Sequence, residues 1–326
     1  MSIDKQTSLI ALPCPDLTEA IEFFTDRLGF RLEMIVPADA PRAAVVSGHG
    51  VTLRLDSTQT DGELANDAKG LVISRASSAD AWHIGRAGME YRDLIPGRLS
   101  GRFIASHIRI PGGGEVPDYV HFHKVRFQMI YCKAGWVRVV YEDQGEPFVL
   151  HPGDCVLQPP EIRHRVLESS PGLEVIEIGS PAVHETFVEH QLQLPTGRVL
   201  PERLFGGQRF VRHIASEANW TASPIAGCEK RDTGIAAATN GLASARVHRF
   251  VAKASASKQR HEGEFLFLFV LNGELGFVSR EEGKHQLLSG DSCVVPAGLD
   301  FSLEPGAGLE LLEVSLPADL LQASSL

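Results

Sequence analysis

The sequence lacks the long hydrophobic runs that a membrane-spanning helix requires. Its longest apolar stretches, such as residues 265–271, have the length of a β-strand, whereas a transmembrane helix needs about 20 apolar residues. The first residues carry an early acidic side chain and no long apolar core, so they do not have the pattern of a secretory signal. We therefore expect no membrane partner and a cytoplasmic location.

Cysteine is also scarce. The chain has five cysteines in 326 residues, an odd number without paired spacing: Cys14, Cys132, Cys155, Cys228 and Cys293. This scatter argues against a zinc ribbon or a redox dithiol and predicts reduced, mostly buried thiols.

Basic residues are outnumbered, since 31 lysines and arginines stand against 41 acidic residues and the formal net charge is −10. Binding to a nucleic-acid backbone needs clustered positive charge, so we expect no nucleic-acid partner. A local group of arginines could still bind a small anion. The hydrophobic fraction of 43% and the charged fraction of 22% are those of a globular protein.

What the sequence does contain is an internal repeat. Three pairs of positions align at offsets between 137 and 139 residues: 88–93 with 227–232, His123 with His261, and Pro159 with Pro296. Such a steady offset indicates that a whole unit was duplicated. Each unit has short segments rich in β-branched and aromatic residues between glycine or proline turns, which predicts a β-barrel or jelly roll.

We therefore predict a mainly β chain with a small α/β module in front of two barrels. Its expected parts are the module (1–60), a linker (61–84), the first barrel (85–185), a connection of unassigned structure (186–226) and the second barrel (227–317). In the module, four apolar residues recur at helical spacing between strand-like stretches: Leu17, Ile21, Phe24 and Leu28. The pattern predicts the order β-α-β-β-β.

The first repeat unit carries a group of histidines. His121 and His123 are two residues apart, so on a strand both imidazoles point to the same face. With Gln128 and His164, their spacing resembles the paired motifs of the cupin family, G-x5-H-x-H-x4-E-x6-G and G-x5-P-x-G-x2-H-x3-N. Gln128 stands where the family usually has Glu, and Glu161 replaces the usual Gly.

This resemblance implies that the units are double-stranded β-helix barrels and that the first holds one divalent transition metal. The implied metal ligands are His121, His123, Gln128 and His164. Imidazole suits iron, manganese, nickel and zinc alike, so the identity of the metal stays open. Glutamine is a neutral donor and a weaker ligand than a carboxylate, which leaves the metal with a higher net positive charge.

The second repeat unit has lost this set of ligands. The corresponding positions are occupied by Gln259, His261, Leu266 and Phe301. One imidazole with a leucine and a phenylalanine cannot hold a divalent ion, so we expect a metal-free barrel that supports the first or mediates assembly.

The N-terminal residues 8–30 resemble one half of a glyoxalase, or vicinal-oxygen-chelate, domain. Such domains take a metal through a histidine of the first strand and a late glutamate, but Leu9 occupies the first position and 51–56 offers no Glu. We expect no metal here. A half module leaves a sheet face open, and its apolar groups would be Val45, Val51, Leu53 and Leu55. We therefore expect a homodimer or larger homo-oligomer to which residues 1–56 contribute.

Candidate substrate ligands are the cationic side chains around the metal motif. They are His107, Arg109, Arg126 and Arg138. A guanidinium group beside a metal would bind a carboxylate or enolate through two hydrogen bonds. Strand alternation places His107 and Arg109 on one face, opposite Ile108 and Ile110, and the sequence leaves open which face points inward.

These features predict a mononuclear metal-dependent enzyme that acts on a small, anionic, oxygenated metabolite. Resemblance to two-cupin ring-cleaving and diketone-cleaving oxygenases favours an Fe(II)-type dioxygenase, because three histidines leave positions for substrate and O2. The neutral Gln128 favours a non-redox isomerase, cyclase, lyase or hydrolase that uses the metal as a Lewis acid. A non-catalytic, ligand-binding or sensory bicupin is the third possibility. No catalytic residue can be assigned from the sequence.

Overall fold

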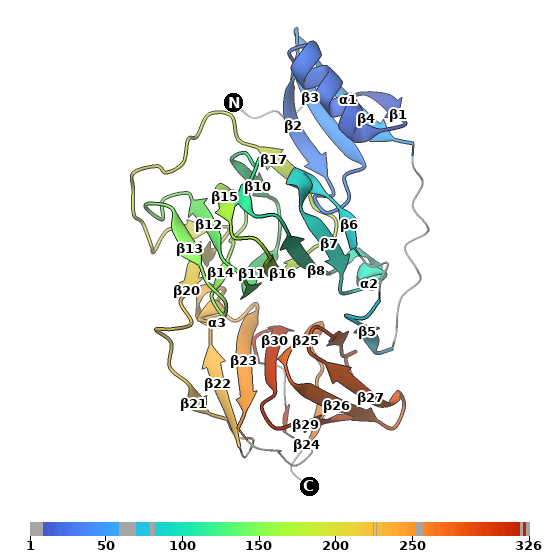
Figure 1. Ribbon diagram of the computed structural model, residues 1–326, viewed down its shortest axis with the longest axis vertical. Helices are drawn as coiled ribbons and strands as arrows, with labels where there is room; N and C mark the ends of the chain where they lie inside the picture. Colours follow the sequence, from blue (N-terminus) through green and yellow to red (C-terminus); the bar gives the residue numbers. More distant parts are fainter. Residues whose placement is uncertain are drawn as a thin grey trace.

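The computed structural model of the chain describes residues 9–58, 70–78, 82–223, 225, 227–251, 257–319 and 322–323. Three bodies are stacked along the long axis: the N-terminal module, the first barrel and the second barrel (Figure 1). Among the described residues, no helix has the length and apolar character needed to cross a membrane. All five cysteines are free and buried, as predicted.

The N-terminal module has the predicted order of elements. These are β1 (Ile10–Cys14), α1 (Leu17–Glu22) with the π-helical turn η1 (Phe23–Arg27), β2 (Arg31–Val36), β3 (Ala43–Gly48) and β4 (Val51–Ser57). The helix begins after Asp16, whose side chain accepts a hydrogen bond of 3.0 Å from the Glu19 amide and so satisfies a free N–H of the first turn. The strand order is β1-β4-β3-β2, with β1 parallel to β4.

The open face of this sheet is not the apolar surface expected from the sequence. Leu53 and Leu55 pack in the core that the helix α1 covers. The register pairs Val45 with Arg54, so Val45 lies on the other face. Arg54 forms an ion pair of 2.8 Å with Asp56 on that side. The expectation was wrong because strand alternation turns Leu53 and Leu55 towards α1 and leaves only Val45 of these residues on the open face.

The first barrel is formed by two sheets and a few short turns of helix. Its elements are β6 (Trp82–Ile84), η2 (Arg86–Gly88), β7 (Glu90–Asp93), α2 (Arg98–Gly101), β8 (Ile104–Ile110), β9 (Gly114–Glu115), β10 (His121–His123), β11 (Phe127–Ala134), β12 (Val137–Tyr141), β13 (Phe148–Leu150), β14 (Cys155–Leu157), β15 (His164–Ser169), β16 (Leu173–Ser180) and β17 (Thr186–Val188). One sheet has the order β17-β10-β15-β12-β13, and the other contains β14-β11-β16-β8-β7-β6.

The connection that the sequence left unassigned consists of short strands. After β17 they are β18 (Leu204–Phe205), β19 (Gln208–Arg209), β20 (Val211–His213) and β21 (Thr221–Ala222). Strand β20 extends the second sheet of the first barrel, and β21 starts a sheet of the second barrel. The connection therefore belongs to both barrels.

The second barrel repeats this arrangement with two further sheets. Its elements are β22 (Cys228–Asp232), α3 (Ile235–Ala238), β23 (Ser244–Phe250), β24 (Ser257–Arg260), β25 (Phe265–Asn272), β26 (Glu274–Ser279), β27 (Gly283–Leu288), β28 (Ser292–Val294), β29 (Phe301–Pro305), β30 (Glu310–Leu316) and β31 (Gln322–Ala323). The sheets have the orders β21-β22-β23-β30-β25-β28-β5, where β5 is Val72–Ser74, and β27-β26-β29-β24-β31.

Strand β5 (Val72–Ser74) comes from the segment expected to be a linker, yet it pairs with β28 of the second barrel. Strand β6 lies in the same segment and pairs with β7 of the first barrel. Residues 59–69 and 79–81 of this segment lie outside the described residues. The segment therefore ties both barrels together in addition to connecting the module to them.

The two barrels share a hydrophobic core at their interface. The aromatic rings of Phe103 and Phe265 stack across it at 4.2 Å between centroids, and Phe127, Met129 and Phe267 belong to the same buried cluster. Burying large apolar side chains provides most of the free energy that holds such layers together. The face of β11 that carries Phe127 and Met129 therefore points away from the interior of the first barrel.

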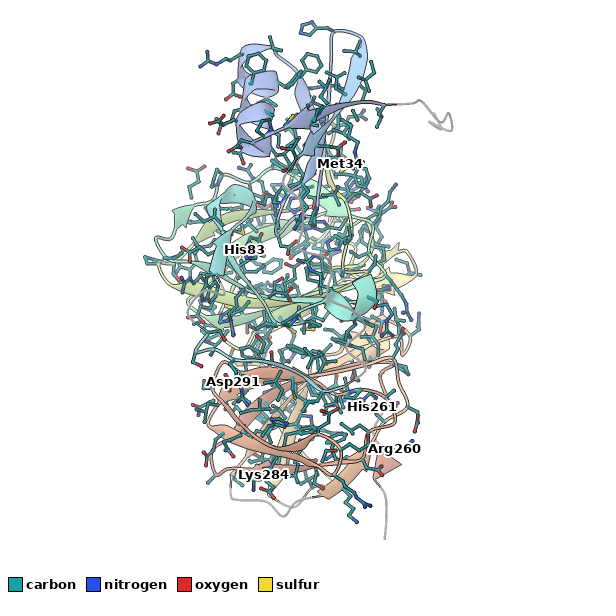
Figure 2. The ribbon with its side chains drawn as sticks, turned by 90° about the vertical axis from the view of Figure 1, so that its right-hand side faces the viewer. Met34, His83, Arg260, His261, Lys284 and Asp291 are labelled. Atoms are coloured by element: carbon teal, nitrogen blue, oxygen red, sulfur yellow. The ribbon has the colours of Figure 1, made fainter. Side chains whose placement is uncertain are left out.

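The module joins the first barrel through β17. Thr186 and Phe187 of this strand pair with Ile35 and Met34 of β2 on one side, while the same strand pairs with β10 on the other. One continuous ten-stranded sheet results, and Figure 2 shows Met34 at the junction of the two bodies. The edge strand β2 of the module is thus covered by β17 of the same chain.

Candidate metal centre

Two neighbouring strands bring three histidines together. His121 and His123 point to the same face of β10, and His164 at the start of β15 pairs directly with His121 in the antiparallel register. All three residues are buried, with exposed fractions of 1%, 6% and 5%. One ring nitrogen from each lies within 4.8 Å of the other two, and no other such group of three potential ligands occurs in the described parts of the chain.

Hydrogen bonds on the far side of each ring fix how the three imidazoles face one another. The Nδ1 atoms of His121 and His164 lie 2.8 Å and 3.0 Å from the carbonyl oxygens of Tyr119 and Ile162. A carbonyl oxygen only accepts, so each Nδ1 carries the proton and each Nε2 keeps its lone pair, which in His121 accepts a hydrogen bond of 3.3 Å from Nη2 of Arg86. The Nδ1 of His123 lies 3.1 Å from the Thr186 hydroxyl. Metal-binding histidines are held in the same way, so these residues fit a divalent metal ion.

The environment keeps the imidazoles neutral. Burial is the largest effect on all three and lowers the pKa of His164 to about 4. Burial also holds the pKa of His121 and His123 well below the usual value, and the positive charge of Arg86 adds to this at both rings. Because a metal binds the unprotonated ring, the site is ready to bind at neutral pH.

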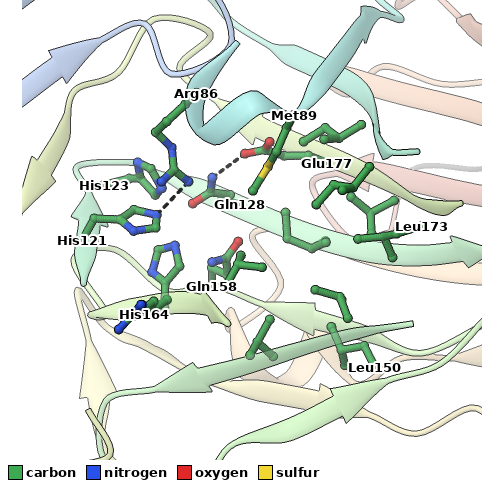
Figure 3. Close-up of a pocket in the computed structure, with 18 of the residues that line it drawn as sticks. Arg86, Met89, His121, His123, Gln128, Leu150, Gln158, His164, Leu173 and Glu177 are labelled. Atoms are coloured by element: carbon green, nitrogen blue, oxygen red, sulfur yellow. Dashed lines mark hydrogen bonds between the residues drawn. The ribbon is translucent and has the colours of Figure 1, made fainter. Parts of the chain in front are cut away.

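The histidines lie at one end of a cavity of about 90 Å³ inside the first barrel. Figure 3 shows Gln128 and Glu177 beside them, with Met89, Leu150 and Leu173 among the apolar walls. The amide nitrogen of Gln128 donates a hydrogen bond of 2.6 Å to Glu177. Burial raises the pKa of Glu177. The site therefore combines neutral nitrogen donors, one amide and one buried carboxyl group within an apolar chamber.

Comparisons with known proteins agree with this architecture. The family model of the cupin domain matches residues 106–178, the part of the chain that contains all four predicted ligands. The chain is similar to oxalate decarboxylase from Bacillus subtilis, with a TM-score of 0.57 at 12% identity over 81% of each chain. It is also similar to salicylate 1,2-dioxygenase from Pseudaminobacter salicylatoxidans, with a TM-score of 0.53 at 17% identity over 69% of this chain and 75% of the other.

The fold is that of a bicupin. At these identities the likeness establishes the fold, and the activity has to be inferred from the site. No curated protein sequence matches the chain.

Arg86 is a cavity residue of this bicupin that the sequence did not indicate. Its guanidinium group forms an ion pair with the buried Asp118 and places Nη2 3.3 Å from Nε2 of His121. Asp118 is held in turn by the backbone amides of Tyr119 and Val166, each at 2.9 Å. Arg86 lies 35 residues before His121 on the turn η2, so no local spacing connects it with the motif.

Arg86 also borders a larger groove of about 740 Å³ between the module and the first cupin barrel. The helix α1 contributes Leu17 and Ile21 to this groove, and Pro117 lies on the barrel side. The same cation therefore faces the groove and the metal cavity.

The four cationic residues expected to bind substrate do not line the cavity. Ile108 and Ile110 point inward, so their neighbours His107 and Arg109 point outward, where they contact Glu174 (2.8 Å) and Glu90 (2.6 Å). Arg126 bridges the two barrels by pairing with Glu264 at 2.7 Å, and Arg138 pairs with Glu168 at 3.0 Å on the surface. Strand pairing or barrel packing brings a carboxylate close to each of the four, and burial also lowers the pKa of His107.

In the second cupin barrel the corresponding positions form a packed core. Leu266 and Phe301 are 0% and 3% exposed and belong to its hydrophobic cluster. The ring of Phe301 stacks on Phe277 at 5.3 Å, and His261 contacts the carbonyl oxygen of Val295 at 2.9 Å. This packing supports the prediction that the second barrel binds no metal.

Proposed function

We propose that the chain is a mononuclear metal-dependent cupin enzyme that acts on a small, anionic, oxygenated metabolite. The observation that carries this proposal is the set of three buried imidazoles whose Nδ1 atoms are engaged and whose Nε2 atoms face one cavity. Gln128 would be the fourth ligand, through its amide oxygen, because its nitrogen is already engaged by Glu177.

The chain's own residues would bind and orient the substrate. Arg86 offers a guanidinium group beside His121, which suits a carboxylate or enolate oxygen. The apolar walls would receive the hydrocarbon part of the substrate and exclude water, which strengthens electrostatic interactions at the site. Because Arg86 borders the outer groove as well, an anion arriving through that groove would meet this cation first.

When bound, the metal would polarise the substrate oxygen and, if it is iron, bring O2 to the same place. We favour an Fe(II)-type dioxygenase, because three histidines leave positions for both substrate and O2. The fold shared with salicylate 1,2-dioxygenase is consistent with that choice. The neutral amide of Gln128 supports the alternative of a non-redox lyase, isomerase, cyclase or hydrolase.

Metal analysis followed by oxygen-electrode measurements tests the proposal. Protein purified without added metal should contain about one transition-metal ion per chain. The His121→Ala variant should contain almost none, and the matched variant His261→Ala in the second barrel should keep the full content. Equal metal content in the parent protein and His121→Ala would refute a site at these histidines.

Small aromatic and aliphatic carboxylic acids are then screened for turnover. Oxygen consumed in proportion to product supports the dioxygenase, and turnover without oxygen consumption supports the non-redox alternative. An Arg86→Lys variant should raise KM more than it lowers kcat, because the two parallel hydrogen bonds of a guanidinium group are lost.

A further inference from the structure

A carboxylate occurs at the same place in both barrels. Residues 172–182 (GLEVIEIGSPA) and 308–318 (GLELLEVSLPA) align without a gap at an offset of 136, which matches Glu177 with Glu313. Glu177 on β16 lines the metal cavity. Glu313 on β30 is 6% exposed, and its alternate neighbour Leu311 belongs to the interior core of the second barrel.

The two carboxylates have different partners. Glu313 lies 3.4 Å from Nε2 of His248 and 3.8 Å from Nη1 of Arg246 on the neighbouring strand β23. The second barrel therefore places two cationic side chains around its buried anion.

The first barrel lacks both of these cations. Glu313 pairs with Arg246 in the strand register where Glu177 pairs with Ser106, and two residues further along β8 the place of His248 is taken by Ile108. Among the described residues, Glu177 forms no ion pair, and its hydrogen-bond partner is the Gln128 amide. Arg86 and His184 are near enough for electrostatic attraction to Glu177, but Arg86 is paired with Asp118, and His184 forms no ion pair with Glu177 within the described residues.

A buried carboxylate without a cation is costly, and a metal ion at the three histidines would supply the missing positive charge. The hydrogen bond between Gln128 and Glu177 provides the link. It turns the amide nitrogen away, leaves the amide oxygen for the metal, and increases the negative charge on that oxygen through the polarised amide. Outer partners of this kind orient and tune metal ligands in proteins.

We infer that Glu177 is the anionic partner of the metal centre and acts through Gln128. It is a positioning residue that supplies, from β16, the negative charge that a Glu at position 128 would have supplied directly. The inference rests on the proposed metal site and adds a determinant of its charge and affinity.

Titration of the metal-free protein with Co2+, followed by visible absorption and competition with a chelator, tests the inference. Glu177→Gln should weaken Co2+ binding about 10- to 100-fold, the range seen when outer partners are removed. The matched change Glu313→Gln in the second barrel should leave the affinity unchanged. The exchange variant Gln128→Glu/Glu177→Gln should recover most of the parent affinity, because it returns one carboxylate and one amide to the same pair.

Thermal unfolding of the metal-free variants separates this role from a structural one. Removing an uncompensated buried charge should leave the Tm of Glu177→Gln equal to or above that of the parent, whereas Glu313→Gln should lower it by breaking an ion pair. A lower Tm for Glu177→Gln, or a Co2+ affinity equal to that of the parent, would overturn the inference. If the parent and His121→Ala both fail to bind Co2+, the proposed metal site itself is wrong and the role of Glu177 falls with it.

Discussion

Thr186 of β17 contacts one of the three histidines of the proposed metal site and orients its ring. Its hydroxyl lies 3.1 Å from Nδ1 of His123, and the residue is completely buried. The other two histidines are held by backbone carbonyl oxygens, which no substitution can remove, so His123 is the one of the three histidines whose orientation depends on a side chain.

We predict that Thr186→Val, which keeps the shape but removes the hydroxyl, lowers metal affinity by about tenfold. Co2+ titration measures the effect. The exposed Thr221, whose hydroxyl contacts the carbonyl oxygen of Lys230 at 3.3 Å, provides the control Thr221→Val with unchanged affinity. Equal affinities for the parent and Thr186→Val would show that packing alone orients His123.

The histidines of the proposed metal site could be recognised from the sequence because two of them are neighbours on one strand. Their alternation is a local property of the chain, and His164 follows at a spacing typical of the cupin family. Arg86 and Glu177 could not be found in this way. They reach the cavity from η2 and β16, so their proximity depends on strand pairing between distant segments. The alternation along β8, with His107 and Arg109 on one face and Ile108 and Ile110 on the other, was predicted. Which of the two faces points into the barrel became clear only from the structure, where Ile108 and Ile110 line the cavity.

At the scale of single elements, the pairing of β23 with β30 buries a charged pair inside the second barrel. Burial lowers the pKa of His248, but Glu313 and Cys228 outweigh this effect and raise the pKa to about 9. A histidine whose pKa is higher in the folded than in the unfolded state stabilises the fold fully below pH 6.5, and this stabilisation is lost as the pH rises through 9.

We therefore predict that His248→Gln destabilises the second barrel most near pH 6. The difference in free energy of unfolding from the parent should be on the order of 3 kcal/mol there and should shrink between pH 6.5 and 10. Urea denaturation at pH 6, 8 and 10 measures it. The variant His285→Gln is the control, because its ring contacts the carbonyl oxygen of Glu282 at 2.8 Å and forms no ion pair with any residue that the structure describes. A difference independent of pH would contradict the prediction.

Long, strongly patterned elements were predictable, whereas short ones were not. The helix α1 and the strands of both repeat units follow from local periodicity. Strand β5 has three residues, and β17 is equally short. Each is stabilised by strands that are distant in the sequence. Strand β5 pairs with β28, and β17 pairs with both β10 and β2. Their own residues carry too little pattern to reveal this.

At the scale of the whole molecule, the module is built into the first barrel as an extension of its sheet. Strand β17 lies between β2 of the module and β10, which carries two histidines of the proposed metal site. A displacement of the module would therefore move β17, which pairs with the strand that carries His123 and contacts the ring of His123 through Thr186. The order of the three bodies was predictable from the repeat, but the edge by which the module docks was not, because it is set by a three-residue strand.

The module lies at the end of the molecule away from the second barrel (Figure 1), and some of its apolar groups are exposed to solvent. They are Leu9, Ile10, Phe23, Leu28 and Val51, with exposed fractions between 40% and 62%. In addition, β1 is the free edge of the ten-stranded sheet, and an open edge beside exposed apolar side chains favours association. We propose that a second copy of the chain covers this end, because isologous pairing would join two half modules.

We predict that the chain is a homodimer or larger assembly held by this end of the module. The variant Ile10→Lys/Val51→Lys should be monomeric, because two lysines would place like charges across the isologous contact, while the module fold tolerates them at exposed positions. Multi-angle light scattering measures the mass. The control Leu288→Lys changes an equally exposed leucine (55%) of the second barrel and should keep the parent mass. A monomeric parent would refute the dimer, and a double variant that remains associated would place the contact on the barrels.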